Sequence, residues 1–160
     1  MGALRHTEAK YHPLSRPPEA EAEAVMRFLS LAKAAGEPHT YVVHLSTALG
    51  LDIIRLMRKN GQRNLWAETC PQYLLLDDSR YNDPVEGLKY IMSPPLRKPA
   101  DEAALWAGLR EEDIDAVGTD HCPFFFATQK QRGARDFTCC PNGAPGVELR
   151  MALLFSEGYK

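Results

Sequence analysis

The chain has 160 residues, of which 44% are hydrophobic and 25% are charged, and its formal net charge is −2. These values are those of a globular protein with one core, and the absence of a basic block argues against nucleic acid as a partner. No apolar run approaches the roughly 18 residues that cross a membrane, and the N-terminus lacks the apolar stretch of a secretory signal.

The first predicted elements are a flexible arm over residues 1–10 and a helix over residues 19–35. Ser15 can cap this helix, and prolines suit its first turn because their missing N–H groups cost little there. The apolar residues of the helix recur at the spacing of one buried stripe. This stripe consists of Val25, Phe28, Leu29 and Ala32.

Apolar runs of strand length alternate with further helical patterns along the rest of the chain. The predicted strands are 40–46, 65–70 and 114–119, and the predicted helices are 48–59, 100–110 and 147–157. This alternation predicts an α/β fold whose parallel strands are covered on both faces. Three strands cannot close a barrel of eight, so residues 1–160 are expected to be a single segment of a larger α/β unit.

Two residues with metal-ligand chemistry stand near the ends of predicted strands. His44 lies near the end of the first strand, and Asp120 follows the last strand at the point where a proline-containing loop begins. Barrels place their chemistry at this edge, and imidazole and carboxylate are zinc ligands. The alternatives are a structural histidine and a loop-capping aspartate. Two ligands do not hold a catalytic zinc, so further ligands would come from elsewhere.

Other polar residues carry weaker signals. Ser93 precedes two prolines, which force an extended backbone and would hold its carbonyl and N–H rigidly for contact with an amide. Asn142 lies in a Pro-Asn-Gly turn signal. Glu68 could reach the same edge of the sheet, whereas the side chain of His121 is expected to point away from that of Asp120. The four cysteines form no C-x-x-C pair and predict reduced thiols in a cytoplasmic protein.

Six sequence blocks carry a resemblance to a known family. They are YHPLSRPPE at 11–19, YVVHLS at 41–46, ETCPQYL at 68–74, SPPLR at 93–97, GTDHCPF at 118–124 and PNG at 141–143. In order and rough spacing they resemble the dihydropyrimidinase/D-hydantoinase family of the amidohydrolase superfamily. The resemblance covers nearly the whole chain and corresponds to the C-terminal part of the family's barrel.

The resemblance implies a partial (β/α)8 TIM-type barrel, comprising about strands six to eight with their helices. It implies a hydrolase that opens dihydropyrimidine or hydantoin rings with a metal-bound hydroxide, in an intact site with two divalent metals, usually zinc. His44 and Asp120 match metal ligands of the family, and the resemblance implies that Asp120 also handles the proton of the attacking hydroxide. Ser93 and Asn142 match the residues that hold the ring amide of the substrate.

The chain lacks several parts of the family pattern. The His-x-His pair of strand one, the carboxylated lysine of strand four and the histidine of strand five are absent, and Cys139-Cys140 replaces a more usual basic and aliphatic pair. We therefore expect a fragment that is inactive alone, with the N-terminal barrel portion and further copies of the chain as partners. The alternatives are an allantoinase- or dihydroorotase-like hydrolase and a non-catalytic interaction protein like the collapsin response mediators. The SPPLR and PNG blocks argue against the former, and His44 with Asp120 argues against the latter.

Overall fold

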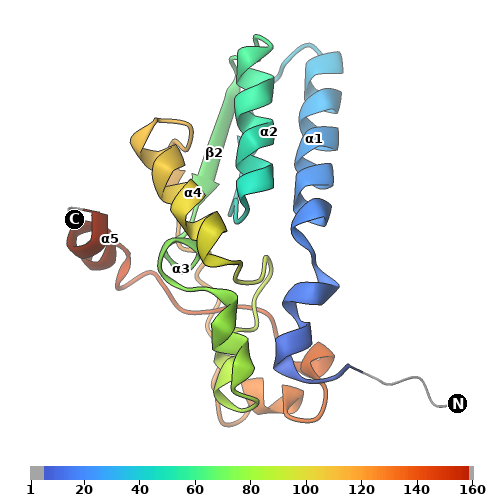
Figure 1. Ribbon diagram of the computed structural model, residues 1–160, viewed down its shortest axis with the longest axis vertical. Coiled ribbons are helices and arrows are strands. Elements are labelled where there is room, and N and C mark those ends of the chain that lie inside the picture. Colours follow the sequence, from blue (N-terminus) through green and yellow to red (C-terminus); the bar gives the residue numbers. More distant parts are fainter. Residues whose placement is uncertain (1–5, 159–160) are drawn as a thin grey trace, which may run out of the picture.

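The computed structural model describes residues 6–158 and shows three parallel strands with helices along one face (Figure 1). The strands are β1 (Thr40–Val42), β2 (Leu65–Thr69) and β3 (Ala116–Val117), and they lie in the order β1-β2-β3. The helices against them are α1 (Pro18–Ala34), α2 (Ala48–Lys59) and α4 (Pro99–Arg110). We call this part, residues 17–69 and 98–118, the helix–sheet half. The predicted α/β alternation and parallel sheet are confirmed.

The strands are staggered along the sheet. β1 pairs with the first part of β2, with Thr40 opposite Leu65. β3 pairs with the last part, with Glu68 opposite Ala116. The strands predicted over 40–46 and 114–119 are thus shorter than expected, because the backbone leaves the regular ladder soon after Val42 and Val117.

The core of the helix–sheet half lies between α2 and the sheet. Thr47 caps α2 by accepting a hydrogen bond from the N–H of Gly50, and the predicted bounds of this helix are confirmed. Its buried face carries Leu51, Ile54 and Met57. Leu49 and Leu56 of the same helix are both 44% exposed, because this helix has apolar residues on more than one side and the pattern alone does not select the inner one.

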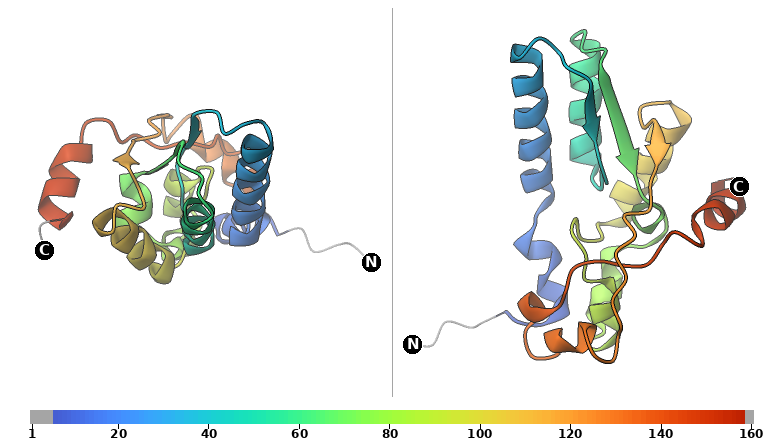
Figure 2. Two further views of the ribbon diagram at one scale, coloured as in Figure 1. Left: turned by 90° about the horizontal axis from the view of Figure 1, so that it is seen from above. Right: turned by 180° about the vertical axis from the view of Figure 1, so that it is seen from behind.

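The helices cover only one face of the sheet (Figure 2). Side chains alternate accordingly, so that Val42 and Ala67 are buried whereas Tyr41, Val43 and Trp66 are 36–48% exposed. The expected coverage of both faces is therefore not found within residues 6–158. The strands therefore have an apolar face that none of the described residues covers fully.

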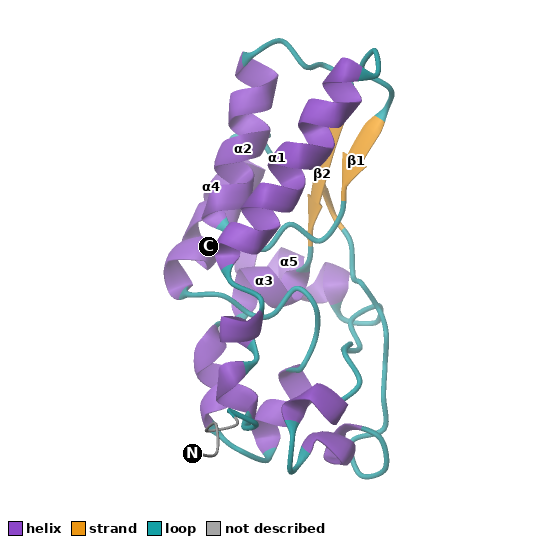
Figure 3. Cartoon of the chain, turned by 90° about the vertical axis from the view of Figure 1, so that its right-hand side faces the viewer, coloured by secondary structure: helices purple, strands orange, loops and turns teal. Residues whose placement is uncertain are grey.

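The remainder of the molecule is a loop-rich half, formed by residues 6–16, 76–97 and 119–146 (Figure 3). Its short elements are η1 (Ala9–Tyr11), η2 (Pro13–Ser15), η3 (Asp78–Asn82), η4 (Glu86–Tyr90), η5 (Lys130–Gly133) and η6 (Phe137–Cys139). The short helix α3 (Pro71–Leu75) connects the two halves. Of the arm expected over residues 1–10, residues 1–5 lie outside the described residues and Ala9 is buried within η1.

The last helix, α5 (Arg150–Gly158), lies to the side of both halves (Figure 1). It starts three residues later than the pattern predicts, and Met151 and Phe155 on it are 69% and 79% exposed. Among residues 6–158, no helix is long and apolar enough to cross a membrane.

Candidate functional site

The two predicted metal ligands lie at the same edge of the sheet, beyond the carboxyl ends of the outer strands. His44 directly precedes Leu45, whose N–H donates to the carbonyl of Glu68 in β2 at 2.7 Å. Asp120 comes two residues after Gly118, whose N–H donates to the carbonyl of Thr69 at 2.9 Å. Both residues therefore flank the end of the middle strand, and the outer strands are about 10 Å apart at this level.

The backbone of both residues is left-handed. His44 has φ of 42° and Asp120 has φ of 48°, in a region that side-chain-bearing residues seldom adopt. The other non-glycine residues with positive φ among residues 6–158 are Glu37 and Glu112, and both follow the end of a helix, where this conformation is common. The left-handed conformation at His44 and Asp120 serves no helix end. Such a conformation costs on the order of 1–3 kcal/mol and persists where the surroundings fix it.

A buried polar network holds the loop that follows His44. The Glu21 carboxylate of α1 accepts hydrogen bonds from the backbone N–H groups of Ser46 and Thr47, at 3.1 and 3.0 Å, and from both hydroxyls. Arg97, which is 7% exposed, donates to Ser46 Oγ at 3.0 Å and to the carbonyl of Arg16 at 2.6 Å. The SRPP, HLS and SPPLR blocks of the sequence thus meet in one network, which fixes the position of His44.

The two predicted substrate-binding residues contact each other. The hydroxyl of Ser93 donates to Oδ1 of Asn142 at 2.8 Å, although 49 residues separate them in the sequence. Both side chains are exposed, so their outward faces are open to a ligand. Met92, which precedes Ser93, has its carbonyl 2.7 Å from Nε2 of the buried His12.

A cavity of 570 Å³ follows the free edge of β1 alongside α1. Tyr41, Val43 and Phe28 line its apolar length, and His44 and Ser93 stand among its lining residues. The cavity therefore connects one predicted ligand with one predicted substrate residue.

Burial and nearby carboxylates determine the charge states around Asp120. Burial raises the pKa of the Cys70 thiol to about 12, and the charges of Glu68 and Asp120 act in the same direction. Burial also raises the pKa of Tyr73 well above its usual range. Both groups stay protonated at neutral pH, so neither is a nucleophile or a base under these conditions.

The neighbouring polar residues are engaged elsewhere. The Glu68 carboxylate accepts a hydrogen bond from the hydroxyl of Tyr41 at 3.0 Å. His121 turns to the C-terminal loop, where its Nδ1 accepts from the N–H groups of Gly146 and Val147 at 3.1 and 3.3 Å. Asp120 is exposed and His44 is half-buried.

A metal fits this edge only in part. His44 and Asp120 offer one imidazole and one carboxylate, whereas zinc in catalytic sites takes three protein ligands. Over the described range 6–158, no group of three or more His, Cys, Asp or Glu side chains could hold a metal ion. These residues do not form a complete metal centre by themselves.

Three polar residues that build this region carry no local signal in the sequence. Glu21 lies in a helix rich in alanine and glutamate, and Lys130 lies in a polar run that is typical of exposed loops. Lys130 is nevertheless 3% exposed and His12 is fully buried. The one signal that could have found His12 and Glu21 is their position within or beside the YHPLSRPPE block.

Comparisons with known proteins agree with this architecture, although no protein-family model matches the chain. The D-phenylhydantoinase of Escherichia coli O81 is 54% identical over 152 residues, which are 95% of this chain and 32% of that protein. The crystal structure of dihydropyrimidinase from Brevibacillus agri superposes with a TM-score of 0.91 at 48% identity, covering 95% of this chain and 33% of the other. A D-hydantoinase from a Bacillus species gives a TM-score of 0.92 at 47% identity, with coverages of 96% and 33%.

The chain therefore spans about a third of the length of the relatives it matches. Its small parallel sheet with helices corresponds to a part of the amidohydrolase barrel. By sequence and by structure, the chain is a homologue of the D-hydantoinase and dihydropyrimidinase family over that third.

Proposed function

We propose that this chain forms the C-terminal segment of a metal-dependent hydrolase that opens cyclic amides such as dihydropyrimidines and hydantoins. In this proposal β1, β2 and β3 are strands six to eight of the barrel. The observation that carries it is the pair His44 and Asp120, which flank the end of β2 in left-handed conformations that no helix end requires. The identity of 54% to a D-phenylhydantoinase supports the same substrate class.

In the proposed site, His44 and Asp120 are ligands of divalent metals, with zinc as the metal. The remaining ligands come from the N-terminal portion of the barrel, which this chain does not contain. When bound, divalent metals supply a nucleophile at neutral pH and polarise the amide carbonyl. Asp120 takes up the proton of the nucleophile and passes it to the leaving nitrogen.

Ser93 and Asn142 hold the ring amide of the substrate, largely through main-chain groups. Their mutual hydrogen bond fixes the two segments relative to each other, and both side chains are exposed. Two contacts to the same ring amide raise the affinity of the site for the substrate, because each hydrogen bond contributes to binding. The uncovered sheet face and the free edge of β1 are where the rest of the barrel packs, and assembly of further copies completes the oligomer.

The test is a zinc-supplemented assay of hydantoin and dihydrouracil ring opening. The chain alone is expected to give no useful rate, and the chain combined with an N-terminal portion is expected to give turnover. His44→Ala or Asp120→Ala should then lower that turnover at least about 100-fold, because a ligand or the proton acceptor is lost.

Arg27→Ala is the control, since Arg27 lies on the exposed side of α1 and pairs with the exposed Glu23. It is expected to keep the activity of the unaltered protein. Turnover by the chain alone, or turnover that survives His44→Ala, would overturn the assignment of ligands. Absence of turnover in every combination would favour a non-catalytic interaction protein.

A further inference from the structure

Lys130, at the start of η5, is a buried cation in the middle of the loop-rich half. Only 3% of it is exposed, and its burial lowers the pKa of its ammonium group. Burying an ammonium group is unfavourable unless its three donors find acceptors. The position of these acceptors therefore indicates what the buried ammonium group does.

The acceptors are carbonyls of two segments that are far apart in the sequence. Lys130 Nζ donates to the carbonyl of Ile91 at 2.6 Å and to the carbonyl of Pro141 at 2.9 Å. It also stands 5.6 Å from the ring centre of Phe124, within the range of a cation–π contact. One ammonium group thus contacts the segment before Ser93, the segment before Asn142 and the loop after Asp120.

A second hydrogen bond to the Ile91 carbonyl also joins the Ser93 segment to the Asn142 segment. The N–H of Gly143 donates to the carbonyl of Ile91 at 3.0 Å, so this oxygen receives two hydrogen bonds. Two residues further along, Ser93 bonds to Asn142. The contacts of Lys130 therefore lie directly behind the Ser93–Asn142 pair.

His12 fixes the Ser93 segment through the next carbonyl along the chain. Its Nε2 lies 2.7 Å from the carbonyl of Met92 and must be the donor, since a carbonyl only accepts. The carbonyls of Ile91 and Met92 are thus each held by a different buried side chain, so the backbone before Ser93 is restrained at two successive residues.

We propose that Lys130 is a positioning residue, which keeps the Ser93 and Asn142 segments in the relation that lets both contact one ring amide. This inference rests on the proposed function, in which Ser93 and Asn142 hold the substrate. Displacement of one segment breaks its contact with the amide while the other contact remains, which weakens binding of the substrate. A single ammonium group that spans both segments prevents that displacement.

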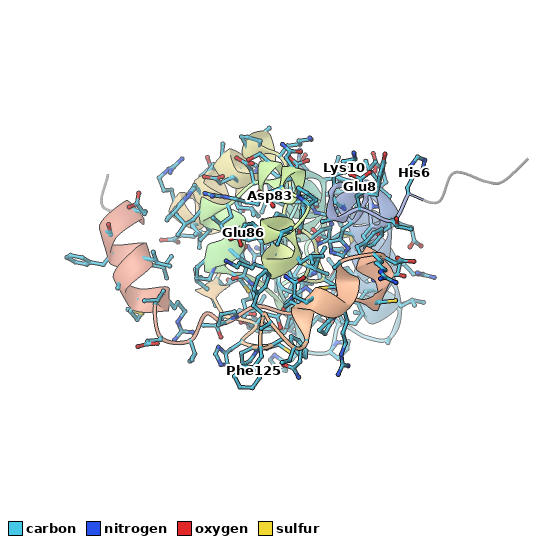
Figure 4. All side chains as sticks on the ribbon, turned by 90° about the horizontal axis from the view of Figure 1, so that it is seen from below. His6, Glu8, Lys10, Asp83, Glu86 and Phe125 are labelled. Carbon is cyan, nitrogen blue, oxygen red and sulfur yellow. The ribbon has the colours of Figure 1, made fainter. Side chains whose placement is uncertain are left out.

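The chain offers a matched control in Lys89. Its Nζ lies 4.8 Å from the ring centre of Phe126, and its partner is the exposed carboxylate of Glu86. Phe125, which lies between Phe124 and Phe126 in the sequence, is 79% exposed and projects from the surface (Figure 4). Lys89 and Lys130 thus share the contact with a phenylalanine ring, and they differ in the carbonyls that Lys130 alone holds.

The test compares Lys130→Met, Lys130→Arg and Lys89→Met in the metal-loaded enzyme that contains this chain. Lys130→Met is expected to raise the KM for hydantoin about tenfold or more while kcat per active site changes less than about threefold, because a charged donor to two carbonyls is lost. Lys130→Arg should recover a large part of the affinity, since it restores donors. Lys89→Met should leave KM unchanged.

A second measurement is amide hydrogen exchange of Gly143, whose N–H is bonded to Ile91. Exchange should accelerate at least about tenfold in Lys130→Met and stay unchanged in Lys89→Met. Turnover with an unchanged KM in Lys130→Met, or unchanged exchange of Gly143, overturns the positioning role and leaves the proposed function intact. Absence of hydantoin turnover in the unaltered enzyme overturns the proposed function and, with it, the substrate role of Lys130.

Discussion

The two halves of the molecule are held together by different kinds of contact. In the helix–sheet half, the buried side chains are mainly aliphatic, and the backbone pairs with itself in helices and strands. In the loop-rich half, buried polar side chains bond to backbone groups that no regular element pairs. Examples are His12 to Met92, Lys130 to Ile91 and Tyr81 to Tyr90. The comparison shows that segments without regular structure can be ordered by side chains that serve as their hydrogen-bond partners.

Glu21 and Arg97 join the two halves, so they offer the strongest test of this comparison. Glu21→Ala is expected to lower the free energy of unfolding by about 3–5 kcal/mol, because it leaves the buried Arg97 without its carboxylate partner and removes the acceptor of two N–H groups. Glu23→Ala, two residues further along α1 on its exposed side, should cost less than about 1 kcal/mol. Urea denaturation of both variants measures the difference. Equal losses would show that the network contributes no more than a surface ion pair.

Removal of an apolar side chain should matter most in the helix–sheet half. Leu29→Ala is expected to cost about 2–5 kcal/mol, since Leu29 on α1 is fully buried and its removal leaves a cavity. Leu31→Ala is the control on the same helix, where the side chain is 64% exposed and the expected change is within about 0.5 kcal/mol. Urea denaturation decides, and a small effect at Leu29 would mean that α1 is only loosely packed on the sheet.

The loop-rich half should respond to pH through His12. Burial lowers the pKa of its imidazole to about 4, against an ordinary value near 6.5, so the folded state favours the neutral form. The contribution of neutral His12 to the free energy of unfolding is fully present above pH 6.5. It is lost as the pH falls toward 4, by up to about 3 kcal/mol, because the unfolded state binds the proton more tightly. The variant His12→Gln keeps a donor for Met92 but does not titrate. The difference in free energy of unfolding between the unaltered protein and His12→Gln should shrink as the pH falls over that range. Parallel curves of stability against pH would contradict the lowered pKa of His12.

The smallest change in stability is expected at Gly118, which lies beside the exposed hydrogen bond between Tyr41 and Glu68. A methyl group at Gly118 would come 2.4–2.6 Å from the carboxyl atoms of Glu68, so the carboxylate must move away from Tyr41. Gly118→Ala should therefore cost about 1 kcal/mol, the net value of a hydrogen bond. In a Glu68→Ala background the same change should cost almost nothing. Thermal unfolding of the four proteins completes the cycle, and additive effects would disprove the contact.

The sequence allowed accurate prediction where local signals coincide. α2 is bounded by the Thr47 cap and the Asn60-Gly61 end, and both its limits were predicted. His44 and Asp120 were placed at strand ends for the same reason, because a short apolar run followed by a polar residue and a turn is a local pattern. The bond between Ser93 and Asn142 joins residues 49 apart, and resemblance to a family, rather than any pattern, brought these two together.

The contacts of Lys130 could not be predicted in this way. Its acceptors lie 39 and 11 residues away, and both are backbone carbonyls, which have no sequence signature. The exposure of Phe28 and Trp66 was also missed, since apolar periodicity identifies a face without saying what covers it. In physical terms, the sequence pattern reports local backbone preference, whereas the loop-rich half is specified by long-range polar contacts.

The uncovered face of the sheet places the two tryptophans of this chain in different surroundings. Trp66 lies on that face, 36% exposed, with its ring stacked on His39 at a centroid distance of 5.4 Å. Trp106 on α4 donates its indole N–H to the carbonyl of Leu74 at 2.8 Å and packs against the core. Covering the sheet face should move the fluorescence emission of Trp66 to shorter wavelength and leave that of Trp106 unchanged. The protein thus carries an intrinsic optical reporter of anything that covers this face, together with its own internal reference.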